Sequence, residues 1–179
     1  MSGGPLPTDA ELYYVTNRRH RGDNRWTPDS YGNDPSSHGT ENLRFGKVVL
    51  PYGPEEAQAH LGRDCGFGNG DGCTLSEYLV GTTDAAQIEA FEERLAFEEN
   101  DATQSRKRFG STRALAALQE AMEEGSDVLI FVHGFNVDWW SAVASALSLE
   151  FMLNRVPGKR VRVVLLTWPS DGKKIPWWS

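Results

Sequence analysis

The clearest pattern in the chain is an apolar, β-branched run that stops at a His-Gly pair. Residues 128–132 (Val-Leu-Ile-Phe-Val) predict a strand buried on both faces, as in a mostly parallel sheet. Asn136 or Asp138 can cap the amphipathic helix predicted over 139–153. A second β-rich run follows at 161–167, so the order strand, helix, strand predicts one crossover unit with a parallel strand pair.

A further helix is predicted before this unit. Its apolar stripe is Leu115, Leu118 and Met122, it spans about 112–124, and Gly125 lies just past its end. Residues 111–179 therefore predict a partial α/β core.

The first 110 residues carry a weaker pattern. Short strands are predicted at 12–16 and 47–50, with a long loop between them over 17–45. We expect residues 1–110 to form an irregular N-terminal part that leans on the core at 111–179.

Two segments of that N-terminal part differ in composition. Residues 52–82 are rich in glycine and predict a poorly regular insertion. Residues 84–99 space apolar side chains between glutamates and predict an amphipathic helix with a solvated acidic face.

Charge and targeting signals narrow the function classes. With 18 Lys and Arg against 25 Asp and Glu, the net charge is −7, which argues against nucleic acid or an anionic membrane as partner. The basic cluster at 18–21 is interpreted as a solvated loop. No signal peptide and no run long enough to span a membrane is visible, so the cytoplasm is the expected location.

The two cysteines, Cys65 and Cys73, do not form a metal motif. Their spacing fits neither CxxC nor a four-ligand zinc site, so no metal and no cofactor is expected. A disulfide between them is compatible only with an oxidising compartment. Two unpaired thiols are the preferred interpretation, although the sequence does not decide whether they pair.

The turn after residue 132 carries the main candidate chemistry. An oxyanion hole needs donors that are fixed before charge develops, and the backbone N–H groups of Phe135 and Asn136 are the candidates. Gly134 permits close approach, and His133 is expected to shape the loop rather than act as the base. The alternative interpretation is an ordinary turn between a strand and a helix.

A second polar loop is expected at the same edge of the sheet. Trp168, Ser170 and Asp171 follow the strand at 161–167, so they share the rim with His133. Ser170 lacks the G-x-S-x-G surroundings of a nucleophile, which occur nowhere in the chain, and no His follows it. Ser170 and Asp171 are therefore interpreted as turn residues.

Three motifs occur in a characteristic order. They are residues 13–18 (Tyr-Tyr-Val-Thr-Asn-Arg), the run at 128–137, and residues 166–172 (Leu-Thr-Trp-Pro-Ser-Asp-Gly). Together they resemble a bacterial esterase/lipase-like branch of the α/β-hydrolase superfamily, a domain of unknown function. The resemblance spans the chain except 53–110.

The resemblance implies the N-terminal portion of a serine ester hydrolase, incomplete at its C-terminus. In that family a serine elbow, an acid and a histidine follow the Trp-Pro-Ser segment, and residues 1–179 contain none of them. Only the oxyanion loop, His133 to Asn136, carries over. The substrate would be a small-molecule ester or acyl compound, and the chain alone is expected to be inactive.

Other consequences follow from an incomplete fold. The strand ending at Thr167 is expected to be an open edge or to have a half-covered face, which favours self-association or pairing with a missing C-terminal segment. The alternatives are a non-catalytic binding subunit, a decayed fragment, or a small α/β ligand-binding module. A bound anion at the turn over 134–136 would favour the last of these.

Overall fold

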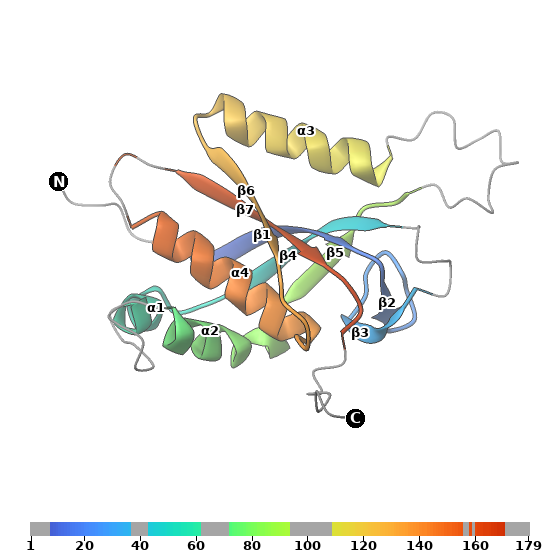
Figure 1. Cartoon of the computed structure of the whole chain (residues 1–179), viewed down its shortest axis with the longest axis horizontal. Coiled ribbons are helices and arrows are strands. Elements are labelled where there is room, and N and C mark those ends of the chain that lie inside the picture. Colours follow the sequence, from blue (N-terminus) through green and yellow to red (C-terminus); the bar gives the residue numbers. More distant parts are fainter. Residues whose placement is uncertain are drawn as a thin grey trace, which may run out of the picture.

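The computed structural model describes residues 8–36, 43–61, 72–93, 109–155, 158 and 160–170 (Figure 1). Its strands are β1 (Asp9–Thr16), β2 (Arg18–Arg21), β3 (Ser30–Pro35), β4 (Arg44–Pro51), β5 (Gln87–Ala90), β6 (Asp127–Val132) and β7 (Val161–Thr167). Its helices are α1 (Pro54–Leu61), α2 (Cys73–Val80), the short 3₁₀ helix η1 (Thr83–Ala85), α3 (Gly110–Glu123) and α4 (Trp139–Leu153).

The main sheet has the strand order β5-β4-β1-β7-β6. Strands β6 and β7 are parallel, with Asp127 opposite Val161, and β7 is parallel to β1, with Tyr13 opposite Val164. Strand β4 pairs antiparallel with both β1 and β5. The predicted parallel pair joined by the helix over 139–153 is confirmed, and the mixed α/β architecture agrees with a partial α/β-hydrolase fold.

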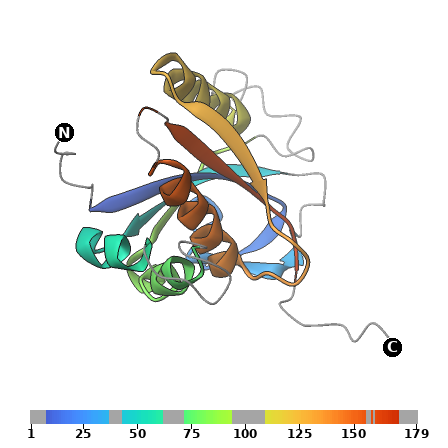
Figure 2. The same cartoon turned by 60° about the vertical axis from the view of Figure 1, so that its left-hand side comes forward.

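The core lies on the face of the sheet that α4, α1 and α2 cover, whereas α3 lies on the opposite face (Figures 1 and 2). Strand β1 alternates strictly, so Leu12 and Tyr14 are buried on the α4 side. Trp139 at the start of α4 contacts the Tyr14 ring at a centroid distance of 5.1 Å, and the Tyr14 hydroxyl bonds that of Tyr31 at 2.8 Å. These aromatic contacts fix α4 against the sheet.

The two predicted core strands take other positions in the sheet than expected. Strand β7 lies inside the sheet between β1 and β6, so the expectation of an open edge at the strand ending at Thr167 is wrong. Strand β6 is at the edge, where Ile130 and Val132 are 63% and 56% exposed, so the interpretation of 128–132 as buried on both faces is also wrong. Apolar composition alone does not distinguish an inner strand from an edge strand.

The N-terminal part is more regular than its sequence suggests. Strands β2 and β3 form an antiparallel pair within the predicted loop over 17–45, and α1 and α2 lie within the predicted insertion over 52–82. The helix expected over 84–99 is wrong for its described residues, which form η1 and β5. Ile88 and Ala90 are both buried there, so a period of two and pairing with β4 decide the structure.

Cys73 at the start of α2 is disulfide-bonded, so the interpretation as a free thiol is wrong. Cys65, the other cysteine of the chain, lies outside the described residues. Disulfides are typical of oxidising compartments, so a cytoplasmic location stays a prediction. Within the described ranges, no helix has both the length and the apolar character needed to cross a bilayer.

Candidate functional site

The two predicted loops meet at the carboxyl ends of β6 and β7. The backbone N–H of Val137 donates a 3.0 Å hydrogen bond to the Ser170 hydroxyl, and the rings of His133 and Trp168 are 5.8 Å apart. Parallel pairing brings both strand ends to one edge, which is where open α/β sheets bind ligands. Asp171 lies outside the described residues.

His133 is buried at this edge, with 4% of its surface exposed. Its Nδ1 is 2.7 Å from the Gly134 carbonyl, which only accepts, so the ring proton lies on Nδ1. Its Nε2 then accepts a 2.8 Å hydrogen bond from the Thr167 hydroxyl. The Trp168 indole N–H faces the same Nδ1 at 3.1 Å and gains no hydrogen bond in this tautomer, because both groups are donors.

Burial lowers the pKa of His133 below its ordinary value of 6.5, and the Arg18 cation lowers it further, against the opposing hydrogen bond to Gly134. The imidazole is therefore neutral at pH 7. Thr167 is the hydroxyl that contacts it, but only 2% of Thr167 is exposed, so this pair does not reach a substrate. Both observations agree with a histidine that shapes the loop.

Arg18 is the residue that the sequence interpretation missed. The solvated loop assigned to 18–21 is wrong for Arg18, whose side chain is buried with 1% exposure. Its Nε donates to the Thr167 hydroxyl at 2.9 Å, and its Nη2 donates to the Val137 carbonyl at 2.7 Å. Its Nη1 donates to the carbonyls of Gly32 at 3.2 Å and Ser170 at 3.4 Å.

The Arg18 guanidinium thus joins β3, β7 and the loop before α4. Burial lowers the pKa of Arg18 to about 10, which leaves it charged at neutral pH, and nearby Asp138 partly offsets the shift. A signal was present in the sequence: Leu12, Tyr14, Thr16 and Arg18 continue one period-two series toward the core. Extending that series past Thr16 would have placed Arg18 inside.

Ser170 is buried, and both its hydroxyl and its carbonyl accept hydrogen bonds. Its hydroxyl accepts from the Val137 N–H, its carbonyl accepts from Arg18, and 6% of its surface is exposed. This position is that of a turn residue that fastens one loop to the other.

The loop between His133 and α4 has an unusual backbone. Asn136 has φ of 71°, the left-handed region that few residues other than glycine adopt. The N–H groups of Phe135 and Asn136 make no hydrogen bond to any residue that the structure describes. Since 62% of Phe135 is exposed, this stretch faces solvent at the rim.

A carboxylate lies at the start of α4. The Asp138 carboxylate caps the helix by accepting the Ser141 N–H at 3.0 Å. Burial opposes ionisation of Asp138, but the hydrogen bonds from Ser141 outweigh it and lower its pKa. In the described ranges, no group of three or more His, Cys, Asp or Glu side chains is arranged to hold a metal ion.

Comparison with known proteins gives a match to a protein family. Residues 111–177 match the family described as "Alpha/beta hydrolase of unknown function (DUF900)". The matched segment is more than a third of the chain, and it is similar to this α/β-hydrolase family. It contains β6, α4 and β7 and both rim loops. Neither the curated proteins nor the solved structures include a match to this chain.

Proposed function

We propose that this chain supplies the oxyanion-hole loop of a serine ester hydrolase. In this proposal the backbone N–H groups of Phe135 and Asn136 donate to the oxyanion that forms when a serine attacks an ester carbonyl. The nucleophile, the acid and the base would come from a segment outside residues 1–179. This chain would then be inactive by itself.

The observation that carries the proposal is the state of those two N–H groups. Backbone donors that are buried are normally paired within the protein, whereas a site that binds an anion keeps donors open to an incoming ligand. Neither N–H donates to a described residue, while the next one, at Val137, is bonded to Ser170. The family match over 111–177 adds the hydrolase context.

Rigidity supports the same proposal. The loop is held at its start by the hydrogen bond from His133 to the Gly134 carbonyl, and at its end by the contacts of Val137 with Arg18 and Ser170. Donors held in place before the reaction need no reorganisation when charge develops, and this is the source of oxyanion-hole catalysis.

The test is a titration with dimethylphosphinate, a tetrahedral anion that mimics the oxyanion, followed by ¹H–¹⁵N spectra. We expect the Phe135 and Asn136 amide signals to move with a common dissociation constant. The Val137 amide is the internal control, because its donor is already bonded to Ser170. Shifts spread evenly over the protein, or none at these two amides, would contradict the proposal.

A non-catalytic binding role is the second candidate. The observation in its favour is that Thr167, whose hydroxyl bonds His133, and Ser170 are both almost fully buried. A binding module would show the same phosphinate titration. It would show no gain of ester hydrolysis in a longer chain that carries the G-x-S-x-G segment, and this result separates the two roles.

A further inference from the structure

Helix α3 packs closely against the chain just after β5 at its first turn. At its start, a side chain on Gly110 would lie 2.7 Å from the Phe91 carbonyl, so the backbones approach closely there. The Ser111 N–H donates to the Glu93 carboxylate at 2.7 Å, and the Arg113 guanidinium lies 4.1 Å above the Phe91 ring. These contacts fix the first turn of α3.

Farther along, the apolar stripe of α3 remains open. Leu115 and Met122 are 64% and 58% exposed, although an amphipathic helix normally buries such positions. The sheet face opposite also keeps apolar residues exposed at Ile130 and Val132.

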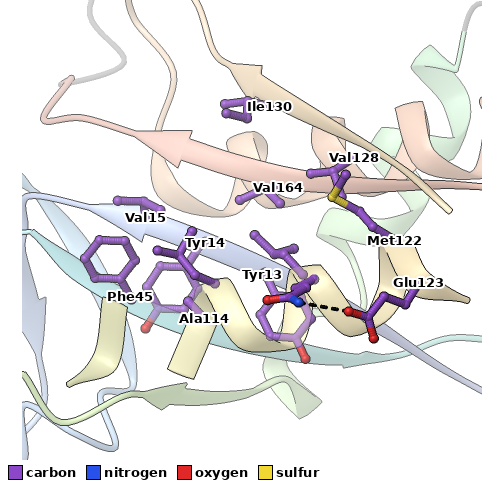
Figure 3. A pocket seen from close by; sticks show the side chains of 13 residues that line it. Tyr13, Tyr14, Val15, Phe45, Ala114, Met122, Glu123, Val128, Ile130 and Val164 are labelled. Atoms are coloured by element: carbon purple, nitrogen blue, oxygen red, sulfur yellow. Dashed lines mark hydrogen bonds between the residues drawn. The ribbon is translucent and has the colours of Figure 1, made fainter. Parts of the chain in front are cut away.

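An apolar cleft of about 610 Å³ lies between this helix and the sheet (Figure 3). Its floor comes from β1, β6 and β7, with Tyr13, Val15, Val128 and Val164, and α3 forms its opposite wall. The volume falls within the roughly 300–1,000 Å³ that is typical of small-molecule sites. The cleft follows α3 from Ala114 to Glu123, which at about 1.5 Å per residue is roughly 14 Å.

We propose that this cleft binds the aliphatic chain of a neutral ester substrate. The proposal rests on the proposed function, because the ester group would lie at the loop over 134–136. It adds where the aliphatic chain of the substrate binds, which is between α3 and the sheet. It also adds the class of substrate, which is an ester with an extended aliphatic chain.

The lining excludes other ligand classes. Its polar side chains are few, and Gln119 and Glu123 among them bond each other at 2.8 Å. Glu123 lies at one end of the cleft (Figure 3). A charged or hydrogen-bonding ligand would lose its water and find few partners along the floor. An aliphatic chain loses nothing there and removes exposed apolar surface from water.

The sheet face gives the direction of the substrate. On β6 the side chains of Val128, Ile130 and Val132 point to one face, and the first two line the cleft. Val132 continues this apolar face toward the rim, where Gly134 begins the candidate oxyanion loop. A substrate whose aliphatic chain lies in the cleft would therefore place its ester group on the rim side.

The experiment uses 1-decanol as probe with the full chain, whose Ile, Leu, Val and Met methyl groups carry ¹³C. We expect saturable shifts of the Leu118, Met122, Val128 and Ile130 methyls, and none at Val143 or Leu147, which are buried residues of α4. The variant Ala114→Phe, which fills the cleft, should weaken binding at least tenfold. Ala116→Phe, at an exposed position of the same helix, should leave binding unchanged.

A second variant covers a failure of Ala114→Phe to fold. Met122→Glu changes an exposed position, so the fold should persist while decanol binding falls. Three results would overturn the proposal. They are decanol-induced shifts outside the cleft, equal binding of decanol by all variants, and a dimer that buries these methyl groups without decanol. Decanol binding together with silent Phe135 and Asn136 amides in the phosphinate titration would instead remove only the proposed function.

Discussion

The Val137 N–H and the Ser170 hydroxyl, 33 residues apart, form a 3.0 Å hydrogen bond that joins the two rim loops. The serine of the Trp-Pro-Ser motif therefore has a structural role. It also fixes the point where the candidate oxyanion loop enters α4. Four predictions follow from this junction and from its neighbours.

Ser170→Ala should destabilise the protein without changing its chemistry. It leaves the Val137 N–H without an acceptor, which costs about 1–2 kcal/mol of unfolding free energy. Urea denaturation measures this cost, and Ser170→Thr, which keeps the hydroxyl, is the control. With p-nitrophenyl acetate, the parent chain and both variants should stay at the background rate. A parent chain that turns over and loses this activity in Ser170→Ala would identify Ser170 as a nucleophile.

Arg18→Met should be far more damaging than the same change one residue later. It removes the donor to the Thr167 hydroxyl and to the carbonyls of Val137, Gly32 and Ser170, and unfolding free energy should fall by at least about 3 kcal/mol. Arg19→Met, at an exposed position, should stay within about 0.5 kcal/mol. Equal effects in urea denaturation would refute the buried position of Arg18.

His133 should make stability depend on pH. Its pKa in the folded protein lies below 6.5, so below that pH the unfolded chain binds a proton that the folded chain does not. Unfolding free energy should therefore be full above pH 6.5 and fall as pH drops from there to the folded pKa. The difference between the parent chain and His133→Gln across this window isolates the effect. The imidazole ¹⁵N spectrum should show the Nδ1–H tautomer, and an Nε2–H tautomer would contradict the assigned network.

Asn136 should tolerate glycine better than alanine. Its φ of 71° costs roughly 1–2 kcal/mol for a residue with a β-carbon, and its side-chain oxygen has no hydrogen-bond partner among the described residues. Asn136→Gly should keep or slightly raise thermal stability, whereas Asn136→Ala should lower it by about 1 kcal/mol. Calorimetry compares the two variants, and the opposite order would show that the loop adopts another backbone in solution.

The sequence by itself determined the elements with a long, regular pattern. The strands at 128–132 and 161–167 and the helix at 139–153 were predicted, together with their parallel pairing. Local periodicity is sufficient for these elements, because short connections leave few alternative arrangements. The meeting of His133 with Trp168 followed from the same parallel pairing. Whether Phe135 and Asn136 form an oxyanion site stays a prediction.

Only the tertiary structure decided which residues lie inside. Arg18 is buried because acceptors on Gly32, Val137 and Thr167 converge on its guanidinium, and two of these are more than 100 residues away in sequence. Likewise, β7 lies inside the sheet and β6 at its edge because β1 takes the place beside β7. Composition does not encode such neighbours, since the cost of burying a charge or exposing an apolar strand depends on partners that folding alone brings together.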